Sequence, residues 1–444
     1  MAADAGFPGT HLASSLPTAN LGPSKKIRTG NVMSISRRAM IGASTATALV
    51  PLRGSHAQPT PTPPIRIGML TDMSGPYRDV TGPVGVACAR QAINEFAKTH
   101  PDIAVEMLVA DHQNKPDIAI GLVREWFDRG GVDMILGVDS SAVALACNTV
   151  VVEKDKVHLN TGAGTSALTG KACNANTVHW TLDTWNIPHS TASAVVKGGG
   201  NSWFFITADY TFGHAAQADT TKFIEAAGGK VIGSAVFPFP ETHDFSAFLL
   251  QAQNSGAKVL GFAAAGTNFI NCVKQAREFG VDRTMTLAAL ACFINDVLAM
   301  GLPVAQGMML TENFYWDFND RTRAFTQRMR PALAADVFPN MDQAGSYAAL
   351  THYLKIVAEL GVAGAKASGR KTVAAMKRMP TDDDCFGPGL IREDGRKIHP
   401  AYLFRAKKPE ESRYAGDVYL HLATTPAEAA FRPMSEGGCP LIGT

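Results

Sequence analysis

The sequence contains none of the motifs that mark common catalytic and nucleotide-binding proteins. It has no GxSxG, no HExxH, no GxGxxG and no repeated acidic metal motif. Its nearest approach to a phosphate-binding loop is GTSALTGK at 164–171, which has one residue too many between its glycines and alanine after its lysine. These absences argue against hydrolases, metalloproteases and nucleotide-driven enzymes, and we expect a protein that is not an enzyme and needs no cofactor.

An excess of one charge sign and long apolar runs are also missing. The 41 Lys and Arg residues nearly balance 39 Asp and Glu residues, which leaves a formal net charge of +2. A basic surface for nucleic acid is therefore not expected. No stretch approaches the roughly 20 apolar residues that a membrane-spanning helix needs. With 444 residues, 46% of them hydrophobic, the chain is long enough for two globular domains.

Metal-binding patterns are absent as well. The seven cysteines form no CxxC pair, and no Cys/His set has zinc-ligand spacing, so no metal site is expected. The acidic run at 382–384 is interpreted as a solvated turn. His112, His214 and His352 are candidates to face a cleft, although a lone histidine is more often a core or surface group. Cys88 lies on the apolar stripe of its expected helix, so we expect it to be a buried free thiol.

The N-terminal region has the features of an export leader. Residues 34–58 read SISRRAMIGASTATALVPLRGSHAQ, in which Arg37 and Arg38 precede an apolar segment and Ser55-His56-Ala57 resembles a cleavage site. This is typical of a twin-arginine signal; the alternative is a short core helix capped by the two arginines. We therefore expect a leader at 1–57, possibly starting at Met33, a stiff Pro-rich linker at 58–64, and a periplasmic mature protein.

After the linker, apolar strands alternate with helical patterns in two successive groups. The first group has expected strands at 65–70, 104–111, 132–138 and 157–162 and expected helices at 86–98, 117–130 and 142–155. The second group has expected strands at 202–209, 230–238, 258–265 and 284–290 and expected helices at 215–228, 244–256 and 268–280. This alternation predicts two doubly wound α/β units with mostly parallel sheets. LTDMSGP at 70–76 and ITADYTFG at 206–213 would be equivalent loops facing a common cleft.

In this order, IRIGMLTDMSG, the 137–141 turn, LNTGAG, ITADYTFG, KQAREFG and DQAGSYAALTHYL resemble the type I periplasmic substrate-binding proteins of branched-chain amino-acid-type ABC transporters. The resemblance covers about residues 65–440. It implies two Rossmann-like lobes joined by three crossovers, near Asp183, near Glu312 and after Phe386, with a ligand enclosed between the lobes. Lobe 1 would contain 65–183 and 312–380, and lobe 2 would contain 184–311 and 381–440.

The resemblance also implies binding residues, each carried over to the matching position. Hydroxyls and backbone amides of lobe 1 would hold a ligand carboxylate, and aromatic side chains of both lobes would enclose its body. The residues implied are Ser140, Ser141, Gly162, Ala163, Gly164, Tyr77, Arg78, Asp79, Asp209, Tyr210, Phe212 and Thr267, and Trp185 lies near the first crossover.

One departure from the family bears on the ligand. Amino-acid-binding members place an acid opposite the ligand ammonium, at a position that falls here around Leu290, where no carboxylate stands. A buried ammonium without a counter-charge costs several kcal/mol. We therefore predict an aromatic carboxylate, of the hydroxybenzoate, phenylacetate or hydroxycinnamate type, with Asp79 or Asp209 accepting a ring hydroxyl. An amino acid or amide ligand, or a ligand-sensing regulator of the same fold, is the alternative.

The expected partners are this small carboxylate and a membrane-embedded ABC transporter permease, with the binding protein acting as a monomer. The cysteine pair usual in the family is missing from lobe 1, so disulfides are assigned from neighbouring elements. We expect Cys147–Cys173, Cys272–Cys292 and Cys385–Cys439 in the oxidising compartment.

Overall fold

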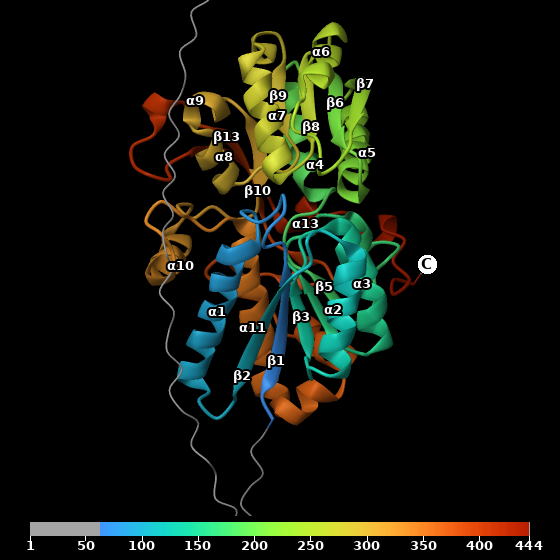
Figure 1. Cartoon of the computed structure of the whole chain (residues 1–444), viewed down its shortest axis with the longest axis vertical. Coiled ribbons are helices and arrows are strands. Elements are labelled where there is room, and N and C mark those ends of the chain that lie inside the picture. Colours follow the sequence, from blue (N-terminus) through green and yellow to red (C-terminus); the bar gives the residue numbers. More distant parts are fainter. Residues whose placement is uncertain (1–62, 444) are drawn as a thin grey trace, which may run out of the picture. The chain divides into compact units, whose positions relative to one another are not determined.

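The computed structural model describes residues 63–443, so the expected leader and most of the linker lie outside the described residues. The described residues belong to one compact unit with the predicted strand and helix alternation (Figure 1). Within 63–443, no helix combines the length and the apolar character needed to cross a membrane.

Lobe 1 contains a five-stranded parallel sheet covered by helices on both faces. Its elements are β1 Ile65–Thr71, α1 Gly82–Thr99, β2 Val105–Asp111, α2 Pro116–Asp128, β3 Met134–Gly137, α3 Ser141–Glu153, β4 Val157–Asn160, η1 Ser166–Thr169, β5 Thr177–His179, α11 Met341–Ala367 and α12 Gly369–Arg378. The strand order is β2-β1-β3-β4-β5, and every pairing is parallel.

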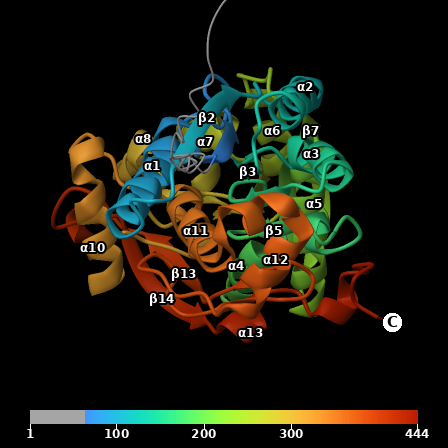
Figure 2. The ribbon, with the colours of Figure 1, turned by 90° about the horizontal axis from the view of Figure 1, so that it is seen from below.

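Burial on both faces explains the nearly continuous apolar character of these strands. Ile65, Ile67 and Met69 of β1 pack in the cluster that holds α1 and α11. Leu70 packs in the opposite cluster with side chains of α2 and α3. Viewed from below, α11 lies between α1 and α12 (Figure 2). The second chain segment, after residue 340, thus completes a face that the first segment leaves uncovered.

Lobe 2 contains a seven-stranded sheet in the order β14-β13-β10-β9-β8-β6-β7. Strands β6 to β10 pair in parallel, whereas β13 and β14 add to the edge in antiparallel pairings. Its elements are α4 Asn186–Lys197, β6 Ser202–Ala208, α5 Thr211–Ala226, β7 Lys230–Phe237, α6 Ser246–Asn254, β8 Val259–Ala263, α7 Gly266–Glu278, β9 Thr286–Ala289, α8 Ile294–Met300, α9 Leu302–Ala305, β10 Met309–Glu312, β13 Ala401–Ala406 and β14 Tyr419–Thr425.

The remaining elements belong to the connections between the lobes: α10 Asp320–Met329, β11 Leu390–Ile391, β12 Lys397–Ile398 and α13 Ala427–Ala430. The chain passes between the two sheets after β5, after β10 and after β12. Within the segment expected to belong to lobe 2 from residue 381, Arg396 forms a β-bridge with His179 of lobe 1. Only β13 and β14 of the 381–440 segment join the lobe-2 sheet, and the tail beyond β14 returns to lobe 1.

This returning tail changes the disulfide assignment. The structure pairs Cys173 with Cys439, with 5.5 Å between their Cα atoms. Cys88, Cys147, Cys272, Cys292 and Cys385 are buried free thiols. All three expected pairings are therefore wrong. Cys439, the partner of Cys173, lies 266 residues further along the chain, in the tail that returns to lobe 1. The expectation that Cys88 is a buried free thiol is confirmed.

Candidate functional site

The loop after β1 is held by one aspartate. Both carboxylate oxygens of Asp72 accept backbone hydrogen bonds, from Ser74 at 3.2 Å, from Gly75 at 2.6 Å and from Tyr77 at 3.0 Å. A Cβ on Gly75 would lie 2.6 Å from this carboxylate, which explains the glycine. Such an Asp-centred turn needs no phosphate to organise it. Its effect is to direct the Tyr77 ring away from the strand and toward lobe 2.

The equivalent loop of lobe 2, between β6 and α5, presents Tyr210 and Phe212. The Tyr210 ring stacks on Phe239 with 4.3 Å between ring centroids, and Tyr77 stacks on the same Phe239 at 5.9 Å. Gly213 is required behind them, because a Cβ there would lie 2.1 Å from the Ala208 carbonyl oxygen. Aromatic rings from both lobes thus converge on one place.

These loops enclose a cavity at the carboxyl ends of the two sheets. The space not filled by protein atoms there, including the part open to solvent, is about 310 Å³. The lining residues are Tyr77, Val80, Asp139, Gly162, Gly164, Leu182 and Asp342 from lobe 1 and its crossover, and Tyr210, Phe212, Ala265, Ala291 and Phe293 from lobe 2. The carboxyl edge of parallel strands is the usual ligand position in α/β proteins.

The lobes are in contact across this cavity. Thr267 of lobe 2 donates from its backbone N–H and its hydroxyl to the Pro76 carbonyl, at 3.2 and 3.1 Å. The hydroxyls of Tyr77 and Tyr210 hydrogen-bond to each other. On the other side, Asn340 Nδ2 donates to Asn295 Oδ1 at 2.7 Å. The structure therefore describes the closed arrangement of the two lobes.

Asp139 is a buried acid with a charged partner and several hydrogen-bond donors. It pairs with His112 at 2.6 Å, and it accepts hydrogen bonds from Thr71, Thr81 and the Asp72 N–H. Burial raises the pKa of Asp139, but His112 and these donors outweigh burial and hold it below its usual value. Burial lowers the pKa of His112, but the Asp139 carboxylate raises it by more, so the pKa lies above its usual value. The two groups form an ion pair with no net charge.

Asp342 is a buried acid without partners. It lies in the first turn of α11 with 1% of its surface exposed, and neither carboxyl oxygen has a hydrogen-bond partner. Burial, followed by the nearby acids Glu312, Asp139 and Asp296, raises its pKa well above the usual value. Within 63–443 no Lys, Arg or His lines the cavity, and no group of acids and histidines is arranged to hold a metal ion.

The structure places five of the fourteen residues predicted for the site in the cavity wall. Tyr77, Gly162, Gly164, Tyr210 and Phe212 line the cavity. Ser140 and Ser141 are buried at the start of α3, and neither hydroxyl has a partner among the described residues. Gly164 has to be glycine, because a Cβ would lie 2.9 Å from the Phe212 ring.

The other predicted residues lie away from the cavity wall. Ala163 belongs to the core of lobe 1, and its N–H donates to Val138 O at 2.9 Å, so it offers no free amide. Arg78 and Asp79 pair with each other at 2.6 Å on the outer surface. Asp209 is exposed and pairs with His214 at 2.8 Å. Their charges are solvated or matched, so these side chains have no reason to turn inward.

Three further residues predicted for the site have other structural roles. Thr267 makes the contact between lobes described above. Trp185 stacks on His189 with centroids 4.7 Å apart, at the crossover and not at the cavity. Leu290 is buried and apolar as expected, but its neighbours Ala291 and Phe293 supply the wall.

Sequence reasoning missed both acids of the cavity. Asp139 stands directly before Ser140, and this adjacency to a predicted hydroxyl was the available signal. Asp342 opens α11, 200 residues later, and nothing local distinguishes it from an ordinary acid in the first turn of a helix. The lack of a carboxylate near Leu290 therefore does not leave the cavity without acids, because Asp139 and Asp342 line it.

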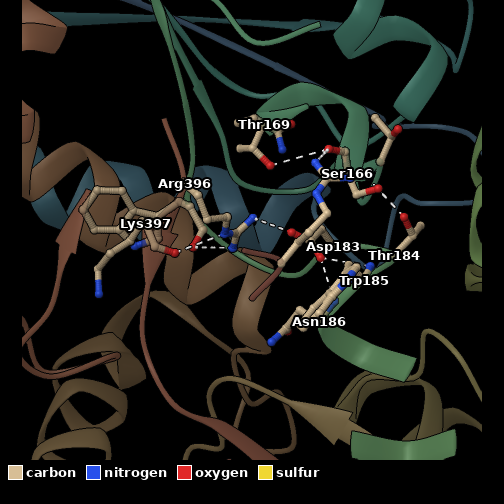
Figure 3. Close-up of polar contacts among 12 residues, drawn as sticks. Ser166, Thr169, Asp183, Thr184, Trp185, Asn186, Arg396 and Lys397 are labelled. Carbon is tan, nitrogen blue, oxygen red and sulfur yellow. Dashed lines mark hydrogen bonds and ion pairs between the residues drawn. The ribbon is translucent and has the colours of Figure 1, made fainter. Parts of the chain in front are cut away.

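A buried ion pair joins Asp183, which follows β5, to Arg396, which directly precedes β12 (Figure 3). Arg396 Nη1 lies 3.4 Å from Asp183 Oδ2, and both side chains are nearly fully buried. Asp183 also accepts the backbone N–H groups of Trp185 and Asn186 at 3.0 and 2.7 Å, where α4 begins. The first and third crossovers are thus linked at the point from which the lobes diverge.

Comparisons with known proteins agree with this architecture. The family described as periplasmic binding protein matches residues 64–412. A periplasmic binding protein of Burkholderia mallei is 44% identical, with a TM-score of 0.81 over 85% of this chain and 99% of its own. A branched-chain amino acid ABC transporter periplasmic ligand-binding protein of Burkholderia xenovorans is 36% identical, with a TM-score of 0.75 over the same shares. No curated protein matches the chain.

A more distant structure resembles the chain in fold. A solute-binding protein of an ABC transporter from R. palustris, in complex with 4-hydroxybenzoate, is 20% identical, with a TM-score of 0.74 over 83% of this chain and 99% of its own.

Proposed function

The chain belongs to the periplasmic binding protein family, and from this premise we propose that it captures a small aromatic carboxylate by closing its two lobes and delivers it to an ABC transporter permease. Proteins of this family bind solutes and are not enzymes. The ligand class and the closure are the proposal, and the ring-lined cavity between the lobes is the observation that carries it.

The body of the ligand is assigned from the rings. Tyr77, Tyr210, Phe212 and Phe293 contribute to one cavity, and two of the rings stack on a shared Phe239 that fixes their planes. Rings packed in offset or edge arrangements add about 0.5–1.5 kcal/mol each beyond the area they bury. A flat ligand between these walls gains this term, whereas a branched aliphatic ligand does not. The R. palustris solute-binding protein of similar fold, in complex with 4-hydroxybenzoate, supports an aromatic carboxylate as the ligand class.

The charged end of the ligand meets donors without a formal charge. The hydroxyls of Ser140 and Ser141 have no partner in the described part of the chain and lie at the start of α3. A helix N-terminus favours an anion by about 0.3–1 kcal/mol. The carboxylate is thus proposed to bind these hydroxyls and the backbone at Gly162 and Gly164, with no arginine involved.

A ligand panel tests this function. Isothermal calorimetry of the mature protein with benzoate, 4-hydroxybenzoate, phenylacetate and leucine should give a dissociation constant of about 1 μM or less, near −8 kcal/mol, for at least one aromatic acid. The bound compound should be recovered unchanged, and scattering should show a smaller radius of gyration with the ligand. Tight binding of leucine with no response to any aromatic acid would contradict the proposed ligand class.

Closure itself is testable through Gly266. This residue begins α7 with φ of +62°, and a Cβ there would lie 2.3 Å from the Pro76 carbonyl oxygen of the other lobe. Gly266→Ala should therefore oppose closure. Overpacking of this kind costs about 1–3 kcal/mol, which is an affinity loss of roughly 5- to 150-fold. Calorimetry with the best acid of the panel measures it.

The matched control for this variant is Gly256→Ala. Gly256 has a similar φ of +69° in the same lobe, and nothing lies within 4 Å of its Cβ position. Both variants introduce the same backbone strain, but only the first places an atom between the lobes. Equal affinity losses in the two variants would show that strain within lobe 2, and not blocked closure, is responsible.

Export completes the proposed role. The related proteins are periplasmic, and Arg37 and Arg38 stand where a twin-arginine signal has its paired arginines. Replacing both by lysine should leave the precursor in the cytoplasm, as measured by cell fractionation. Unchanged export of the double-lysine variant would argue against this route.

A further inference from the structure

Asp342 is the polar side chain of the cavity wall that the protein leaves unsatisfied. Its carboxyl group lines the cavity, is 1% exposed, and forms no hydrogen bond through either oxygen. Its own N–H, by contrast, is bonded to Asn340 Oδ1 at 3.0 Å as part of the α11 cap. The backbone is therefore fixed, whereas the carboxyl group has no charged partner and only the Thr181 hydroxyl as a polar neighbour. Buried groups of this kind require an explanation in a ligand or a functional state.

The charges around Asp342 come from several elements. Asp139 precedes α3, Glu312 ends β10 and Asp296 lies in α8, and all three acids act on Asp342. Asp139 is neutralised by His112. Glu312 is buried beside the Tyr419 hydroxyl, and burial raises its pKa well above the usual value. Burial also raises the pKa of Asp296, to about 8. The hydroxyl of the neighbouring Thr181, in contrast, lowers the pKa of Asp342.

The balance of these effects favours the uncharged form of Asp342. An ionised carboxylate without a partner in a closed cavity is strongly unfavourable, and nearby acids add to this cost. The N-terminal end of α11 favours the charge, but a helix dipole is the smaller effect. An uncharged carboxyl group carries one O–H donor and one carbonyl acceptor. It can therefore bind an anion that a carboxylate would repel.

We propose that Asp342 is held as the neutral carboxylic acid in the closed cleft and donates a hydrogen bond to the carboxylate of the bound ligand. This inference rests on the function proposed above, and it adds a residue that determines specificity for anionic ligands. The proton on Asp342 comes from solvent when the cleft closes at a pH above the pKa of Asp342 in the free protein. No bond other than this O–H is made or broken.

The proposal predicts the sign of the pH dependence. The bound anion stabilises the protonated form of Asp342, so its pKa is higher in the complex than in the free protein. Affinity is then constant at a pH below the free-protein pKa and falls as the pH rises above it, by up to tenfold per pH unit. Calorimetry in two buffers of different ionisation enthalpy should show uptake of up to about one proton per ligand in this range.

Asp342→Asn is the informative variant, because asparagine keeps the shape, one donor and one acceptor but cannot ionise. With 4-hydroxybenzoate as the probe, the variant should bind within about threefold of the wild type at the acidic end and should show no proton uptake. Infrared spectra of the wild-type complex should contain a protonated-carboxyl band that the variant lacks. Asp79→Asn, which removes an exposed acid outside the cavity, should leave the pH dependence unchanged.

The outcomes separate the two proposals. Binding of 4-hydroxybenzoate without proton uptake, or its loss by more than about 100-fold in Asp342→Asn, would overturn the role of Asp342 while leaving the ligand class intact. Tight binding of phenylalanine, with proton release and dependence on Asp342, would mean that Asp342 pairs as a carboxylate with an ammonium group and would overturn the proposal. Failure of every acid of the panel to bind would reject the ligand class and the proposal together.

Discussion

Replacing Arg396 by methionine is expected to lower the free energy of unfolding by about 3–5 kcal/mol, the usual cost of leaving one member of a buried ion pair alone. The guanidinium lies between two crossovers, 3.4 Å from Asp183 and 4.2 Å from the centre of the Phe431 ring. It also donates to Trp180 O at 3.3 Å and to Lys397 O at 3.1 Å. Equilibrium denaturation by urea measures the loss.

The large effect follows from burial and not from the strength of the pair. Arg396 is 0% exposed, and burial lowers its pKa to about 10, so the folded protein already supports this cation at a cost. Methionine fills much of the volume but leaves the Asp183 carboxylate with only the two backbone donors of α4 (Figure 3). Asp183→Asn in the same chain retains an acceptor for these donors and removes the orphaned charge.

A double-mutant cycle therefore provides the control. Asp183→Asn should recover part of the stability lost in Arg396→Met, with a coupling of about 0.5–3 kcal/mol. Arg66→Met, at the more exposed pair with Glu106, should cost less than about 1 kcal/mol. Additive losses at Arg396 and Asp183 would contradict a linked pair and would attribute the effect to packing alone.

Most of the fold could be predicted because its signal is local. The strands of both sheets are apolar runs buried on two faces, such as SWFFITA in β6, and each is followed by a helical pattern. The position of a segment cannot be predicted from local sequence where its contacts are with residues far away in the chain. The tail beyond β14 has no local feature that predicts its return to lobe 1. Its position depends on contacts such as Arg432 Nη2 to Ser166 O at 2.9 Å.

The residues of the candidate site also differ in whether local sequence or distant contacts determine their positions. Tyr77, Tyr210 and Phe212 follow directly after strands, and a loop at the carboxyl end of a strand could be placed at the cavity from the sequence alone. Whether a loop side chain turns inward depends on its partners in space. Arg78 and Asp79 satisfy each other outside, and Asp209 is matched by His214. Asp342 reaches the cavity because α11 packs against α1, a helix that begins about 260 residues earlier in the chain.

Disulfide pairing is the clearest case of a long-range feature. Neighbouring elements predict Cys147–Cys173 in lobe 1 and Cys272–Cys292 in lobe 2, but Cys147, Cys272 and Cys292 are buried free thiols. Burial raises the pKa of the Cys147 thiol to about 12, which makes it unreactive. The pair that forms joins the turn after η1 to the tail beyond β14.

Cys439→Ser is expected to lower the free energy of unfolding by about 2–5 kcal/mol, because Cys173 and Cys439 close a very long loop in the unfolded chain. Their separation of 266 residues lies at the upper end of that entropic scale, where closing a loop of hundreds of residues removes roughly 5 kcal/mol of chain entropy. Urea denaturation of oxidised wild type and variant measures the difference. The same variant should make the tail beyond β14 more sensitive to proteolysis, since its attachment to η1 is lost.

Cys147→Ser is the matched control, since it removes a buried thiol that forms no disulfide. It should change stability by the cost of one core substitution and should leave the tail protected from protease. Reduction of the wild type should reproduce the effect of Cys439→Ser, and reduction of the variant should have no further effect. Recovery of a peptide linking Cys147 to Cys173 in a non-reducing digest would refute the assignment, because the tail would then have no covalent tie and Cys439 would be free.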